Sequence, residues 1–389
     1  MENKAAYMSK PNSQGVEVFV PTRDMKATPP PVRTHKKKVK LSNEQSIYMA
    51  KKKVGSFAMS TVTLILILGL CFVILHPFLK LVPTVFANLE DLGNPNIIWI
   101  PEEFSTQSFN MASYFVLKQG PMTLVKSVGY ALAIMVIQVF ISAMTGYTMA
   151  RVNYKYGTPI IFLMVVLSFL VPRQSLLVSQ YVYFQHFDAM GTMDLLSKIS
   201  IPYFNFQLHE WLSWSPSIPA EINLIGNATS LYIMAILGFG VNQSLLILIF
   251  SQFFKNIPKE LEEAALIDGC GFYKTYFKVM IPNAIPAIVI VAILAFVWNY
   301  GDTYFTRYFD PDGQYLGTKL ATVFANNDTQ KRFVQDTATR LFGMSKASDL
   351  TFDAVKQAGV LIFLVPLLAV YLFAQRWLVE NLESSGLVG

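Results

Sequence analysis

The sequence predicts an all-α membrane protein with six transmembrane helices, a short cytoplasmic helix between two of them, and enlarged extracellular loops. Hydrophobic residues make up 53% of the 389-residue chain and charged residues only 14%, against about 25% charged residues in soluble domains. Apolar runs of about 20 residues recur, and that length crosses a hydrocarbon core of about 30 Å. Lysine and arginine gather in the N-terminal tail and in short loops, as is typical of cytoplasmic segments.

Residues 1–55 are predicted to be a basic cytoplasmic tail, largely disordered. Twelve of the 31 lysines and arginines precede Ser56. The basic run stops where the first apolar run begins, which favours flanking of a membrane helix and contact with anionic lipid over nucleic-acid binding. Ser42-Asn43-Glu44-Gln45 has capping-box spacing, which predicts a short helix at the membrane surface. The first apolar run starts too late for a cleavable signal peptide, so we expect an uncleaved anchor.

Six apolar runs predict a membrane domain that covers residues 56–376. The expected spans are 56–79, 122–150, 158–181, 231–254, 281–300 and 354–373. The basic loops after the second and fourth spans place both loops and both termini in the cytoplasm. The connections at about 80–121, 186–230 and 301–353 then lie outside, and residues 377–389 form a cytoplasmic C-terminal tail.

A helix–glycine–helix pattern lies between the fourth and fifth spans. Pro258 suits a first helical position, and the acidic residues that follow complement the positive N-terminus of a helix. Ala264 and Ala265 are strong helix formers, and they are small enough to let another surface approach closely. Gly269 can adopt the left-handed conformation that ends a helix. The sequence therefore predicts a short acidic helix at the cytoplasmic mouth of two spans.

The spacing in this loop resembles the EAA motif of binding-protein-dependent permeases. Glu263-Ala264-Ala265 is followed by three residues, Gly269, nine residues and Val279-Met280-Ile281-Pro282. The stretches Ile267-Asp268-Gly269, Trp298-Asn299 and 375–380 are similar to the maltose-type carbohydrate permeases of type I ABC importers. Tyr300 and Gly301 stand where that family usually has an acidic and an aromatic residue.

The resemblance implies a coupling helix that docks into a cleft of a separate ATPase. Its contact residues would be Glu263, Ala264, Ala265, Asp268 and Gly269. It also implies a second permease subunit, two ATPase subunits and an extracellular solute-binding protein at the bacterial cell membrane, working by alternating access. We expect no cofactor on this chain, with ATP and Mg²⁺ on the partner ATPase, because the sequence has no Gly-x-x-x-x-Gly-Lys-Ser/Thr phosphate loop.

Polar residues inside the spans indicate either a substrate path or hydrogen bonds between helices. Neutral amides suit hydroxyl-rich solutes because they both donate and accept hydrogen bonds. The substrate-path candidates are Gln138, Asn242, Gln243 and Asn299, with Gln174 and Gln180 as further amides in the third span. Arg173, at the outer end of that span, would either steer an acidic substrate or reach the membrane interface by snorkelling.

The predicted function is that of a sugar or oligosaccharide permease subunit, not an enzyme. Two alternatives remain open: the same class of transporter with a non-sugar solute, and a membrane scaffold or sensor without transport. An integral membrane enzyme is disfavoured, because His76, His186 and His209 lack metal-ligand spacing and the spans lack paired carboxylates. Cys71 and Cys270 indicate no disulfide framework.

Overall fold

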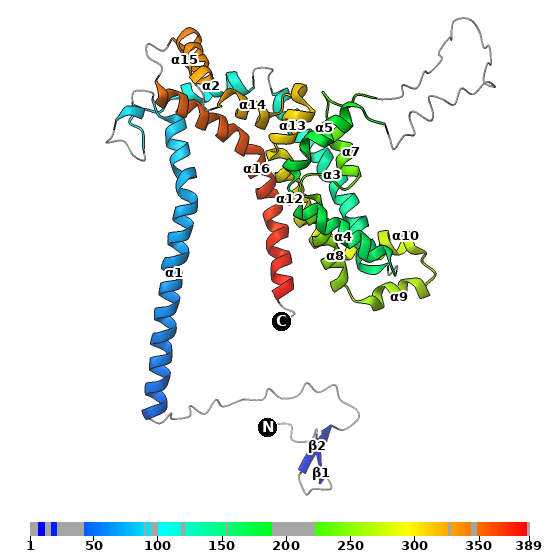
Figure 1. Cartoon of the computed structure of the whole chain (residues 1–389). Coiled ribbons are helices and arrows are strands. Elements are labelled where there is room, and N and C mark those ends of the chain that lie inside the picture. The colour runs from blue at the N-terminus through cyan, green and yellow to red at the C-terminus, as the bar shows by residue number, and fades with distance from the viewer. Residues whose placement is uncertain are drawn as a thin grey trace, which may run out of the picture. The chain divides into compact units, whose positions relative to one another are not determined.

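A computed structural model of the chain describes residues 7–11, 17–21, 43–88, 91–94, 100–117, 121–152, 155–188, 222–325, 328–343 and 348–386. These residues are almost entirely helical (Figure 1). The chain divides into two units, Met1–Ile74 and Leu75–Gly389. The predicted all-α class therefore holds for the second unit, while the first also contains two short strands.

In the first unit, β1 (Tyr7–Pro11) and β2 (Glu17–Pro21) pair antiparallel, with Tyr7 opposite Pro21. The prediction of a largely disordered tail did not include this pair, although β-branched and aromatic residues in β2 favour extended backbone. The helix α1 (Asn43–Phe86) begins beside Ser42 and continues unbroken through the first predicted span. The expected surface helix is thus the beginning of α1, since no residue from Asn43 to Ser56 interrupts it.

Three helices are long and apolar enough to cross a membrane. They are Val54–Phe86 within α1, α3 (Met122–Arg151), and Asp349–Trp377 within α16 (Asp349–Gly386). Two further candidates are bent helix pairs, Gly157–Leu170 with Arg173–Gln185 at 95° and Phe272–Asn283 with Ile285–Gly301 at 78°. By length and composition, the described residues therefore contain three continuous candidate spans, or five if each bent pair counts as one.

Proline accounts for both bends. Val171 is extended and lies between α4 (Gly157–Leu170) and the 3-10 turn η2 (Arg173–Leu176). This turn leads into α5 (Leu177–Gln185). Val171 precedes Pro172, whose ring disfavours the helical conformation of the residue before it. Two prolines, Pro282 and Pro286, flank the second bend at Ala284. That region comprises α10 (Phe272–Thr275), the π-helical turn η3 (Tyr276–Met280), α11 (Ile281–Asn283) and α12 (Ile285–Gly301).

The continuous fourth span expected at 231–254 is not observed. The structure has α7 (Thr229–Ile236) and α8 (Gln243–Asn256) there, separated by a turn. Gly238 and Asn242 adopt positive φ of 85° and 49° in this turn, which ends one helix before the next begins. Hydropathy missed the break because Leu237, Phe239 and Val241 keep the turn apolar.

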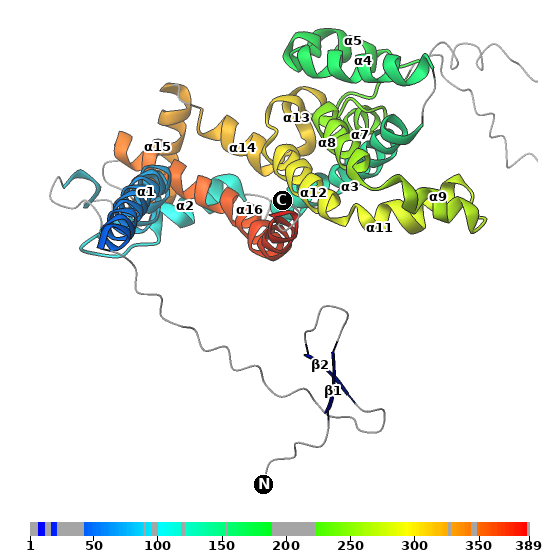
Figure 2. The same cartoon turned by 90° about the horizontal axis from the view of Figure 1, so that it is seen from below.

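The helices α3, α8 and α12 form the centre of the second unit, and α16 lies beside α12 (Figure 2). The helix α3 approaches α8 closely at Gly146, where a Cβ would lie 2.6 Å from Phe250 Cβ and 2.9 Å from the Ser251 nitrogen. Buried aromatic side chains of Tyr147, Phe250 and Phe254 fill the neighbouring core. This packing holds α3 against α8 at the centre of the unit.

The connections predicted to be extracellular fold into further helices. They include η1 (Asp91–Gly93), α2 (Gln107–Val116), α13 (Tyr304–Phe309), η4 (Pro311–Gly313), α14 (Leu316–Val323) and α15 (Asp328–Phe342). Met111, Leu316, Val334 and Phe352 bring α2, α14, α15 and α16 into one core. In Figure 1 this group lies at one end of the second unit, and α9 (Lys259–Ile267) and α10 lie at the other.

Candidate functional site

A short helix, α9, occupies the loop singled out by its motif. Pro258, which was predicted to be the first residue of the helix, directly precedes it. At its end the N–H of Asp268 donates to Ala264 O, and the N–H of Cys270 donates to Ala265 O, each at 2.9 Å. Gly269 has φ of 79°, a conformation that glycine adopts without the steric cost of a Cβ. The helix therefore ends just before Gly269, which has the left-handed conformation that the sequence predicts.

Four of the five motif residues face outward. Glu263, Ala264, Asp268 and Gly269 are exposed, whereas Ala265 is 6% exposed and packs inward. The structure thus separates the motif into an accessible face and one residue that seats the helix.

Glu262, one of the acidic residues that follow Pro258, anchors α9 to α3. Tyr147 Oη donates to Glu262 Oε1 at 2.7 Å, and Arg151 Nε lies 3.5 Å from Glu262 Oε2. Arg151 Nη2 also donates to the Ile257 carbonyl. Tyr147 and Arg151 are four residues apart on α3 and so lie on one face. The spacing of four indicates that Tyr147 and Arg151 share a helix face, but it does not identify Glu262 as their partner.

Three of the four substrate-path candidates form a buried network. Gln138, Gln243 and Asn299 are each at most 1% exposed. Asn299 Nδ2 donates to Gln138 Oε1 at 2.8 Å, Gln138 Nε2 donates to Val241 O at 3.2 Å, and Gln243 Nε2 donates to Ala235 O at 2.8 Å. Gln243 Oε1 accepts from Gly240 N at 2.8 Å. These amides join α3 and α12 to the turn between α7 and α8.

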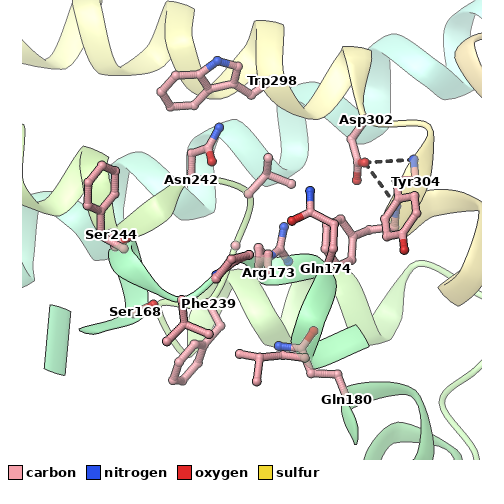
Figure 3. Close-up of a pocket in the computed structure, with 17 residues that line it drawn as sticks. Ser168, Arg173, Gln174, Gln180, Phe239, Asn242, Ser244, Trp298, Asp302 and Tyr304 are labelled. Carbon is pink, nitrogen blue, oxygen red and sulfur yellow. Dashed lines mark hydrogen bonds between the residues drawn. The ribbon is translucent and has the colours of Figure 1, made fainter. Parts of the chain in front are cut away.

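The fourth candidate, Asn242, lines a cavity of about 430 Å³. Figure 3 shows Asn242, Arg173 and Gln174 around this cavity, together with Trp298, Asp302 and Tyr304. The Arg173 guanidinium lies 3.9 Å from the Phe305 ring centroid, and its Nη2 lies 3.9 Å from Met234 Sδ. The structure therefore places Arg173, from the third predicted span, against this cavity.

Asp302 follows the last residue of α12 and faces the same cavity. Its Oδ1 accepts the N–H groups of Tyr304 and Phe305, each at 3.1 Å, and so caps α13. Burial raises the pKa of the Asp302 carboxyl, while the Phe305 N–H and the Arg173 charge oppose that rise. Sequence reasoning did not single out Asp302, because it lies just beyond an apolar run. Within the described ranges no group of three or more His, Cys, Asp or Glu side chains could hold a metal ion.

Comparisons with known proteins agree on one family. Residues 124–384 match the family described as "binding-protein-dependent transport system inner membrane component". The polygalacturonan/rhamnogalacturonan transport system permease protein YtcP of Bacillus subtilis is 22% identical, over 77% of this chain and 87% of that protein. The arabinooligosaccharides transport system permease protein AraQ of Halalkalibacterium halodurans is 23% identical, over 82% of this chain and 93% of that protein.

A solved structure shares the fold. It is that of a bacterial ABC transporter involved in the import of the acidic polysaccharide alginate, and it matches with a TM-score of 0.56 at 15% identity. The match covers 86% of this chain and 98% of the other. At this identity the likeness concerns the arrangement of the helices and carries no information about the solute.

Proposed function

The chain belongs to the family of binding-protein-dependent transport system inner membrane components, and on that premise we propose that it imports a sugar or oligosaccharide as the permease subunit of an ABC importer. The named relatives support a carbohydrate: one is a polygalacturonan/rhamnogalacturonan permease and another an arabinooligosaccharide permease. The individual solute differs between them, so the proposal is limited to the carbohydrate class.

The proposed assembly contains a second permease subunit, two ATPase subunits and an extracellular solute-binding protein, in the bacterial cell membrane. ATP and Mg²⁺ bind the partner ATPase. Six crossings bring both termini to the cytoplasm, and α7 with α8 makes the fourth crossing despite the turn between them. The proposed arrangement has three parts: a basic tail at 1–55, a membrane domain at 56–376 and a C-terminal tail at 377–389.

One observation carries the energy-coupling role: α9 is fixed to α3 through Glu262 while its motif face stays exposed. The helix α3 continues from Arg151 to Gln138, about 20 Å along its axis, and there joins the network around the turn before α8. A displacement of α9 by a closing ATPase pair is therefore transmitted to the cavity at Asn242. This is the structural basis proposed for alternating access.

The test uses two variants of the exposed face and two matched controls. Glu263→Lys reverses a charge, and Asp336→Lys makes the equivalent reversal at an exposed position of α15. Gly269→Val strains a positive-φ glycine, and Gly343→Val does the same at φ of 68° away from α9. Each complex is purified through a tag on this chain and reconstituted into liposomes.

We expect both α9 variants to lose solute uptake and the ATPase stimulation caused by loaded binding protein, while the controls keep both. Normal uptake and stimulation in Glu263→Lys and Gly269→Val would overturn the coupling role. Purification of the wild-type chain without any ATPase would favour a scaffold or sensor, and import restricted to non-sugar solutes would favour the other alternative.

A further inference from the structure

Three interruptions of the apolar helices meet at the cavity of about 430 Å³. They are the bend at Pro172, the turn from Phe239 to Asn242, and the end of α12 before Asp302. Cavities of about 300–1,000 Å³ are typical of small-molecule sites. Transporters often bind solutes where membrane helices are discontinuous, because backbone polar groups become available there. The location thus suits a solute.

Arg173 has hydrogen-bonding capacity that the protein does not use. Its guanidinium is held by the Phe305 ring and by Met234. Its Nε and Nη1 are shielded from solvent and have no hydrogen-bond partner in the part of the chain that the structure describes. Buried polar atoms are nearly always paired, so two unpaired donors on one cation mark a position where a ligand can bind.

Asp302 offers the complementary group. Its Oδ1 caps α13, while its Oδ2 is shielded and lacks a partner among the described residues. Arg173 and Asp302 both line the cavity but form no ion pair with each other. Two side chains of opposite charge, each with unpaired polar atoms, therefore line the same cavity.

We propose that Arg173 and Asp302 form a subsite for a neutral sugar ring that carries vicinal hydroxyl groups, an inference that rests on the proposed function. One hydroxyl donates to Asp302 Oδ2, and the adjacent oxygen accepts from an Arg173 N–H. Trp298 and Tyr304 supply aromatic surface for the apolar part of the ring.

The charge balance selects a neutral ring over a uronate. Arg173 alone would favour a carboxylate, but Asp302 places a negative charge in the same cavity. A sugar carboxylate would bring a second negative charge close to Asp302, and like charges disfavour each other's ionised form. A neutral ring satisfies both side chains without that repulsion.

The test measures equilibrium binding of radiolabelled oligosaccharides to the purified complex without its binding protein. The probes are arabinotriose, maltotriose, trehalose and trigalacturonate. Asp302→Asn and Arg173→Gln alter the subsite, and Arg173→Lys keeps the charge but not the guanidinium. Asp312→Asn and Arg307→Gln are exposed controls of the same chemistry. ATPase stimulation by loaded binding protein reports folding and coupling in each complex.

We expect at least one neutral probe to bind the wild-type complex. Its binding should be at least tenfold weaker in Asp302→Asn and Arg173→Gln, and weakened to an intermediate degree in Arg173→Lys. The two control variants should bind it as the wild type does. Unchanged affinity in the subsite variants would overturn the proposal. A second contradicting result would be that trigalacturonate is the only probe that binds, and that its binding depends on Arg173 and is tighter in Asp302→Asn. That result would indicate an acidic solute. The absence of binding by every neutral probe would overturn the proposal as well. Because ATPase stimulation is read separately, each of these results leaves the coupling role of α9 intact.

Discussion

Replacing Glu262 by glutamine should loosen α9 without altering its exposed face. Glu262 accepts the Tyr147 hydroxyl at 2.7 Å and pairs with Arg151 at 3.5 Å, and the side chains of Arg151 and Glu262 are 5% and 20% exposed. At that separation and an effective dielectric constant of about 20, the attraction is about 5 kcal/mol before desolvation. Desolvation offsets much of this gain, but removing one partner of a largely buried pair typically costs about 3–5 kcal/mol.

Glutamine retains a hydrogen bond to Tyr147, so we expect α9 docking to weaken by less than that, about 2–3 kcal/mol. At 1.36 kcal/mol per factor of ten, local opening becomes roughly 30- to 160-fold more frequent. Hydrogen exchange of the α9 backbone amides in the nucleotide-free complex measures this opening directly. Glu260→Gln, on an exposed residue of the same helix, is the control. Equal exchange rates in Glu262→Gln, Glu260→Gln and wild type would refute the anchoring role.

Three further predictions concern the packing and the outer helices. Gly146→Ala should destabilise the protein by about 2 kcal/mol through overpacking, because the added Cβ would meet Phe250 and the backbone of α8. The control Gly129→Ala, which has open space around the added Cβ, should be neutral or slightly stabilising. Equal melting temperatures of the two variants would contradict this prediction. Gly240→Ala would place a Cβ 2.2 Å from Gln138 Nε2 and 2.4 Å from Gln243 Oε1, so thermal unfolding should occur several degrees lower, and an unchanged midpoint would count against the network. Burial raises the pKa of Asp310 above its ordinary 3.8, so the folded protein binds that proton more tightly than the unfolded chain, and stability should fall as pH rises from 3.8 through the raised pKa. Asp310→Asn should flatten this part of the pH–stability profile, and an identical slope in both proteins would show that Asp310 is not its source.

Hydropathy located the apolar segments but not their breaks. The spans in α1, α3 and α16 are continuous, as the apolar runs predict. The bends at Val171 and Ala284 lie beside prolines that the sequence displays, and these could have been anticipated. The turn between α7 and α8 depends on positive φ at Gly238 and Asn242. Apolar side chains occupy that turn, so an averaged hydropathy does not distinguish it from a helix.

Motif spacing and contact geometry gave different kinds of information about the site. The left-handed conformation of Gly269 at the end of α9 follows from local conformational preference and was predicted correctly. The pairing of Glu262 with Tyr147 and Arg151 joins residues more than 100 positions apart, which a single sequence does not reveal. Likewise, residue type alone could not separate the buried amides Gln138, Gln243 and Asn299 from Asn242, which lines the cavity. Their hydrogen bonds support the interpretation as contacts between helices.

The most direct test of the coupling role is site-specific photo-cross-linking from the exposed face of α9. A photoreactive amino acid replaces Asp268 in one complex and Asp336 on α15 in another, both exposed positions. We predict that the probe at position 268 cross-links to the ATPase subunit with a yield that changes when ATP binds, and that the probe at position 336 does not. Absence of an ATPase cross-link from position 268 in an assembled, transport-active complex would contradict the account.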